Sequence, residues 1–157
     1  MQKITTFLMF NDQAEEAVNL YVSIFGNSKI TDLNRYGEGG PLPAGTVIGG
    51  SFVLEGQEFI AFNGGPHFSF AEGISLYVNC ETQEEVDDLW EKLSEGGEKG
   101  RCGWLKDKFG VSWQIVPSAL PQLLGDEDPR KSANVLQAMM QMSKIDIEAL
   151  RRAYEQE

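Results

Sequence analysis

The sequence predicts an α+β fold in which one order of strand, helix and further strands occurs twice. The segments EEAVNLY and EEVDDLW, which begin at Glu15 and Glu84, match in their acidic and apolar positions. Each segment follows a short β-prone stretch, and further β-prone stretches come after it. A matched order of this kind is typical of a tandem duplication, although two amphipathic helices can also resemble each other by coincidence.

The first copy spans residues 2–65 and opens with a strand and a helix. Residues 4–10, ITTFLMF, are apolar and rich in β-formers. Asp12 and Glu15 have the spacing of a capping box, which predicts the start of a helix. Helical spacing of apolar residues then follows at Ala14, Ala17, Val18, Tyr21 and Phe25.

Three further strands complete the first copy. Residues 29–36 predict a weaker strand, and the Gly- and Pro-rich residues 37–45 predict a loop. Residues 46–65 predict a hairpin that turns at Glu55 and Gly56.

The second copy is shorter and spans residues 73–117. Residues 74–80 predict a strand, and Thr82 with Glu85 forms a second capping box. The apolar face of the next helix is Val86, Leu89, Trp90 and Leu93. A turn, a short strand and a last strand ending at Pro117 follow. A helix packed on a small sheet leaves the other sheet face open, and two such units can bury or share that face.

Residues 118–157 form a helical tail. Asp128 and Pro129 predict a helix start, and Ser143 with Asp146 predicts another. The apolar positions of these helices are Val135, Met139, Met142, Ile147, Leu150 and Tyr154. We expect them to pack against the main domain or a partner subunit; a Met-lined ligand or metal site is the alternative.

Composition excludes several classes of partner. The formal net charge is −11 and no Lys/Arg cluster offsets it, so we expect neither nucleic acid nor an anionic membrane surface as a partner. The apolar runs are too short to cross a bilayer and none resembles a signal peptide, so we expect a cytoplasmic protein. Cys80 and Cys102 are expected to be reduced thiols.

The chemically distinctive stretch is residues 102–117, CGWLKDKFGVSWQIVP. Strand alternation places Trp113 and Ile115 on one face and Gln114 on the other. If Gln114 points into a cavity, its amide can orient a ligand there, whereas the aromatic residues of this stretch can also be plain core. The single histidine, His67, excludes a metal site built mainly from imidazoles within one chain. No nucleophile-elbow, P-loop or dinucleotide-binding motif occurs.

These features together resemble a known family. The segments EEAVNLYVSIFG, FNGGPHFSF, ISLYVNC, EEVDDLWEKLSEGG, CGWLKDKFGVSWQIVP and AMMQMSKIDIEAL are similar to the PhnB-like family. That family carries the label 3-demethylubiquinone-9 3-methyltransferase and belongs to the vicinal oxygen chelate superfamily of glyoxalase I, extradiol dioxygenases and bleomycin-resistance proteins. The resemblance covers nearly the whole chain. It implies a single domain, residues 1–157, of two βαβββ modules that curve into a half-open mixed or antiparallel barrel, followed by C-terminal helices.

The resemblance also implies where a metal would bind. Many members of the superfamily hold a divalent ion with His and Glu side chains on inward-facing strands. The matching positions here are Thr5, Ser75, Gln114 and a residue near Ala61. None of these supplies a charge or an imidazole, so we predict no metal and no cofactor. Phosphonate chemistry, which the PhnB name suggests, would require cations such as Arg35 or Arg101.

Three functions remain open from the sequence. The first is a protein that binds a small molecule in a metal-free cup lined by Thr5, Phe7, Phe62, Ser75, Tyr77, Trp104 and Gln114. The second is an enzyme on a small substrate, labelled as a methyltransferase or resembling a lyase or dioxygenase. Its acid or base would be His67, Cys102 or a pocket carboxylate. The third is a metal enzyme with non-standard ligands. Because the superfamily often forms dimers, we also expect a homodimer.

Overall fold

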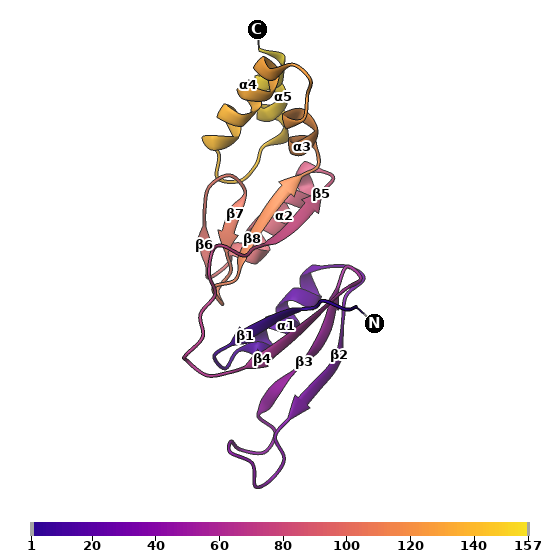
Figure 1. Ribbon diagram of the computed structural model, residues 1–157, viewed down its shortest axis with the longest axis vertical. Coiled ribbons are helices and arrows are strands. Elements are labelled where there is room, and N and C mark those ends of the chain that lie inside the picture. The colour runs from indigo at the N-terminus through magenta and orange to yellow at the C-terminus, as the bar shows by residue number, and fades with distance from the viewer. Residues whose placement is uncertain (1, 157) are drawn as a thin grey trace. The chain divides into compact units, whose positions relative to one another are not determined.

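The computed structural model describes residues 2–156 and divides the chain into two compact units (Figure 1). One unit ends at Ser69 and the other begins at Phe70. Each unit contains one four-stranded sheet. The two units are described separately below.

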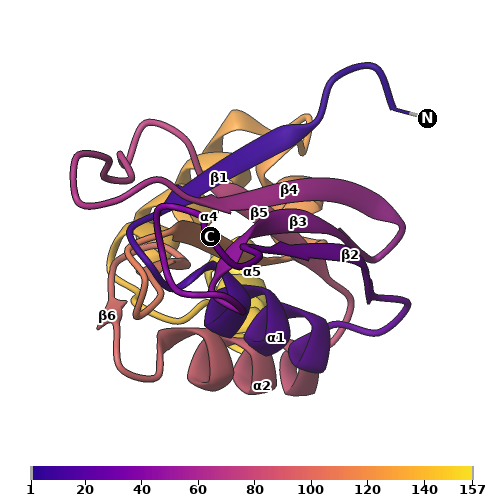
Figure 2. The same cartoon turned by 90° about the horizontal axis from the view of Figure 1, so that it is seen from below.

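The first unit is a sheet with one helix on one face. Its elements are β1 (Thr6–Phe10), α1 (Ala14–Ile24), β2 (Lys29–Arg35), β3 (Val47–Leu54) and β4 (Gln57–Asn63). The strand order is β1-β4-β3-β2, in which β1 and β4 are parallel and the other pairs are antiparallel. Helix α1 lies along the sheet and contacts β2, β3 and β4 (Figure 2).

The core of the first unit lies between α1 and the sheet. Tyr21 of α1 and Phe52 of β3 are fully buried, with ring centroids 6.4 Å apart, and Phe52 stacks on Phe59 at 5.3 Å. Burying one such side chain stabilises the fold by about 2–3 kcal/mol. The β3–β4 hairpin turns at Glu55 and Gly56 with φ values of 49° and 82°, as the sequence predicts, since both turn positions require the left-handed region.

The start of α1 differs from the prediction. Gln13 is the N-cap residue and its side chain makes no capping hydrogen bond, so the predicted capping box of Asp12 and Glu15 is wrong. The amide of Ala14 instead donates to Oδ1 of Asn63 at 2.8 Å. Glu15 pairs with Arg35 at 2.5 Å. A residue of β4 therefore caps this helix.

The second unit repeats the topology of the first. Its elements are β5 (Leu76–Cys80), α2 (Gln83–Ser94), β6 (Glu98–Lys99), β7 (Trp104–Lys106) and β8 (Ser112–Pro117). The strand order is β5-β8-β7-β6, and β5 is parallel to β8 as β1 is to β4. The same order, with the same parallel pair, confirms the α+β fold of two βαβββ modules.

The cap of α2 agrees with the sequence. The amide of Glu85 donates to the hydroxyl of Thr82 at 3.2 Å. The Glu85 carboxylate accepts a hydrogen bond from the amide of Glu81 at 2.9 Å, one residue earlier than an ideal capping box requires. Two backbone donors at this end of the helix are thereby satisfied.

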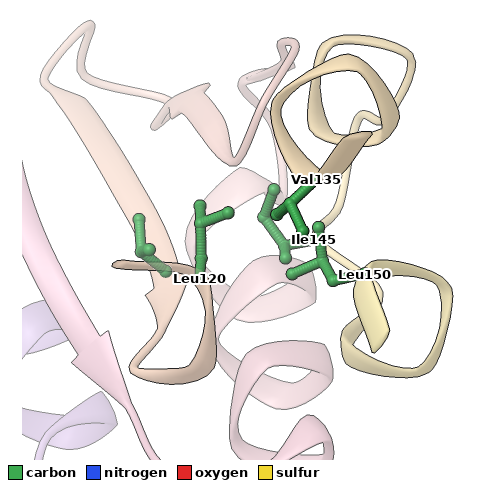
Figure 3. Close-up of a cluster of buried hydrophobic side chains, with 5 residues drawn as sticks. Leu120, Val135, Ile145 and Leu150 are labelled. Carbon is green, nitrogen blue, oxygen red and sulfur yellow. The ribbon is translucent and has the colours of Figure 1, made fainter. Parts of the chain in front are cut away.

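The tail forms three helices that belong to the second unit. These are α3 (Ala119–Leu124), α4 (Pro129–Met140) and α5 (Ile147–Glu155). They enclose a buried cluster with the end of β8, made of Val116, Leu120, Val135, Ile145 and Leu150 (Figure 3). The predicted packing of the tail against the main domain is therefore confirmed.

The tail helices begin at acidic caps. Asp128 caps α4, with Pro129 in its first turn, as predicted. Helix α5 begins later than Ser143, because Asp146 is its N-cap and accepts a hydrogen bond from the amide of Ala149 at 3.1 Å. In the described part of the chain, no helix is both long and apolar enough to span a membrane.

Candidate functional site

The first sheet has an open face, which we define as the side chains that point away from α1: Phe7, Met9, Ile60 and Phe62. Phe7 is 48% exposed, and its ring centroid lies 5.1 Å from that of Phe62. The ring of Phe62 lies over Gly49, where a Cβ atom would come within 2.5 Å of it. Glycine in β3 thus makes room for this aromatic pair.

Thr5 precedes β1 at the edge of the same sheet. Its hydroxyl accepts a hydrogen bond from Nε2 of Gln2 at 3.3 Å. Gln2 also bonds both backbone groups of Glu58, each at 3.1 Å. Gln2 therefore holds the Thr5 side chain and at the same time ties this segment to β4.

The second sheet has a corresponding open face, which points away from α2. It carries a row across three strands, because Tyr77 of β5 pairs with Gln114 of β8, and Gln114 pairs with Trp104 of β7. Trp113 and Ile115 point to the opposite, buried face, as the sequence predicts. The structure thus brings together three predicted pocket residues of this unit, and Tyr77 is 54% exposed.

Ser75 joins this row through a hydrogen bond. Nε2 of Gln114 donates to Oγ of Ser75 at 2.9 Å. This bond fixes the orientation of the Gln114 amide, whose oxygen can then accept a hydrogen bond from a ligand. Aromatic rings of Tyr77 and Trp104 on either side of one oriented amide are a typical arrangement for binding a small, partly apolar molecule.

Asp107 holds the β7–β8 hairpin that positions Trp104 and Gln114, and sequence reasoning missed it. The side chain is buried; Oδ1 accepts from the amides of Phe109 and Val111 at 2.9 and 3.0 Å, and Oδ2 accepts from Nε1 of Trp113 at 2.9 Å. An aspartate just before a Phe-Gly turn is a signal that could have identified this role, because its side chain can accept from the backbone amides of the turn.

The residues at the predicted metal positions do not fit a catalytic divalent ion. Gln114 and Ser75 bond each other through neutral groups. The strand registers make Ile60, and not Ala61, the counterpart of Gln114, because Ile60 pairs with Phe7 as Gln114 pairs with Tyr77. Ala61 is 1% exposed and faces α1. Within residues 2–156, no three His, Cys, Asp or Glu side chains group closely enough to hold an ion.

The two candidate catalytic residues lie in different units. His67 is exposed in the segment after β4. Cys102 is half-buried in the loop before β7 with φ of 59°, and its amide donates to the carbonyl of Met142 at 2.9 Å. The other thiol, Cys80, is fully buried, and burial raises its pKa to about 12. Cys80 is therefore neutral and unsuited to nucleophilic attack.

Cations lie at the edge of the second open face. Nζ of Lys106 is 2.5 Å from Oε1 of Glu72. The hydrogen bond to Lys106 lowers the pKa of Glu72, and the same bond raises the pKa of Lys106, so both groups are charged near neutral pH. Of the two arginines considered from the sequence, Arg35 pairs with Glu15, whereas Arg101 lies in the loop before β7.

Comparison with known proteins identifies the family. The sequence profile of the 3-demethylubiquinone-9 3-methyltransferase family matches residues 2–116. The chain belongs to this family. A PhnB protein from Bacillus cereus, named as a candidate 3-demethylubiquinone-9 3-methyltransferase, is 46% identical over 74% of this chain and 100% of its own, with a TM-score of 0.70.

Two other solved structures are more distant. Protein PA1353 from Pseudomonas aeruginosa is 22% identical, with a TM-score of 0.63 over 74% of this chain and 98% of its own. A glyoxylase/bleomycin resistance protein/dioxygenase domain from Frankia sp. EAN1pec is 15% identical, with a TM-score of 0.46 over 74% and 92%. No curated protein matches the chain significantly. The PhnB-like resemblance is thus confirmed, and no specific activity follows from it.

Proposed function

We propose that this PhnB-like protein binds a small, partly apolar molecule on the open face of its second sheet, without a metal ion. The row of Tyr77, Gln114 and Trp104 supports this proposal, because it combines exposed aromatic surface with one amide oriented by Ser75. Aromatic side chains supply the apolar contact, and the amide supplies one directional hydrogen bond. The aromatic pair of Phe7 and Phe62 offers a similar apolar surface on the first sheet.

A ligand-stabilisation screen tests this function. Compounds that bind are expected to raise the melting temperature of the wild-type protein, because binding to the folded state alone stabilises it by mass action. Gln114→Met keeps the shape of the side chain and removes its amide, so we expect it to weaken binding of a hit about tenfold. Gln122→Met, the same change at an exposed position of α3, is the matched control and should leave binding unchanged.

The stabilisation screen, together with an assay for substrate turnover, distinguishes a binding protein from an enzyme. A screen that yields no hit, together with a substrate that is turned over, would contradict the binding function. In that case the alternative of an enzyme on a small substrate becomes testable with His67→Asn and Cys102→Ala. Methyl transfer, which the family description names, would further require a bound methyl donor.

We further propose that the protein is a cytoplasmic homodimer. Support for a dimer comes from Leu136 and Met140 of α4, which are 43% and 53% exposed although both are apolar. In an isologous dimer, this apolar surface of one subunit would pack against the same surface of the other, so both copies would be buried. Light scattering that shows only a 17.4 kDa species would contradict the dimer.

A further inference from the structure

A cavity beside Trp104 carries charges that the proposed function does not use. Its volume is about 330 Å³, and it lies at the edge of the second sheet formed by β6 and β7. Most of its lining is charged or aromatic: Glu72, Glu98, Lys99, Arg101, Trp104 and Lys106. Trp104 therefore belongs both to this cavity and to the row on the open face.

A carboxylate of the chain itself already sits on one of these cations. Glu72 lies in a turn just before β5 and contacts Lys106 at 2.5 Å. The Glu72 side chain is 70% exposed and that of Lys106 is 37% exposed. Exposed ion pairs contribute little net stability, so another carboxylate can replace Glu72 at small cost.

The charge of the cavity differs from that of the whole chain. The chain has a net charge of −11, whereas three cations and two carboxylates line this cavity. Lys99 is engaged by Glu91 of α2 at 3.0 Å. When Glu72 leaves, Lys106 and Arg101 remain in the lining beside Trp104. Glu98, which pairs with Lys106 in the strand register, is the carboxylate that stays with them, so the two cations still outnumber it.

We infer that this cavity binds small aromatic carboxylates, whose carboxylate replaces that of Glu72 on Lys106 while the ring packs against Trp104. This inference rests on the proposed function and names its ligand class. A carboxylate accepting from an ammonium forms a charge-assisted hydrogen bond, which is stronger than a neutral one. Glu72 then acts as an internal competitor that keeps weak ligands out.

Benzoate is the probe, and benzamide is its neutral counterpart of the same shape. Both are titrated into uniformly ¹⁵N-labelled protein while the indole N–H signals of the three tryptophans are recorded. Trp90 and Trp113 are each 2% exposed, so only Trp104 can touch a ligand directly. Its signal is assigned with Trp104→Phe. We expect benzoate to shift the Trp104 signal saturably and benzamide to bind about tenfold more weakly.

Two variants test the exchange of carboxylates. Lys106→Met should weaken benzoate binding about tenfold, because it removes the charged donor. Glu72→Gln should strengthen it about threefold, because it removes the competitor. Lys108→Met is the control for Lys106→Met, and Glu38→Gln is the control for Glu72→Gln. Each control changes the net charge as its counterpart does but lies outside the cavity lining, so it should have little effect on benzoate binding. Circular dichroism of every variant checks that it is folded.

The outcomes distinguish this inference from the proposed function. Equal affinity for benzoate and benzamide at Trp104, or an unchanged benzoate affinity in Glu72→Gln, would overturn the carboxylate site while leaving small-molecule binding intact. If neither probe shifts Trp104 and the stabilisation screen also yields no hit, both fail. Tighter benzoate binding in Glu72→Gln with loss in Lys106→Met supports the site.

Discussion

Replacement of Asp107 tests how the β7–β8 hairpin is held. Asp107→Ala removes the acceptor of three N–H groups, two on the backbone of the turn and one on the buried indole of Trp113. A buried donor left unsatisfied costs about 1–3 kcal/mol, and the Phe109 amide can reach water more easily than the other two. We therefore expect the free energy of unfolding to fall by about 3–5 kcal/mol.

Asp107→Asn separates charge from shape. Its amide oxygen can accept from the two backbone amides, but its NH₂ group then faces the indole N–H of Trp113. We expect a smaller loss, about 1–3 kcal/mol. Asp88→Asn, at an exposed position of α2, is the control and should change the free energy of unfolding by less than about 0.5 kcal/mol.

Urea unfolding measures these effects. Near-ultraviolet circular dichroism in the tryptophan band follows the packing of the three tryptophans, which all belong to the second unit, and its transition gives the free energy of unfolding for that unit. If Asp107→Ala were as stable as Asp88→Asn, the three hydrogen bonds would not hold the hairpin, and the positioning of Trp104 and Gln114 by Asp107 would be refuted.

Three further changes have expected outcomes. Leu150→Ala should cost about 2–5 kcal/mol by opening the buried tail cluster, whereas Leu42→Ala at an exposed loop position should cost far less; urea unfolding compares them. Gly49→Ala should cost about 1–3 kcal/mol, because the new Cβ would lie 2.5 Å from the Phe62 ring and the Ala61 carbonyl; a wild-type melting temperature would contradict this. The buried Cys80 thiol keeps its proton up to about pH 12, while an unfolded thiol loses it near pH 9, so stability should fall between these pH values. Cys80→Ala should lose less stability than wild type when pH is raised from 8 to 10, and equal losses would count against this cause.

The repeated module could be predicted from the sequence because its signals are local. Apolar spacing within α1 and α2 and the Glu55-Gly56 turn depend on neighbouring residues. The cap of α1 could not be predicted in this way. Its acceptor, Asn63, is 49 residues from Ala14, so only the folded sheet brings the two together.

The candidate site was predictable in part. Alternation along β8 correctly placed Gln114 opposite Trp113, since side chains alternate by geometry. The remaining position was predicted only as near Ala61. The strand register points to its neighbour Ile60, and a shift of one residue moves a side chain to the other face of the sheet. The pair of Glu72 and Lys106 joins a turn to β7 and has no pattern in the sequence.

Native mass spectrometry of protein purified without chelators tests most directly the claim that the protein binds a small molecule without a metal ion. We predict that an organic molecule co-purifies with the wild-type chain and is lost from Gln114→Met, with no metal ion in stoichiometric amount. A tightly held divalent ion that disappears when Ser75 and Gln114 are replaced would contradict the account.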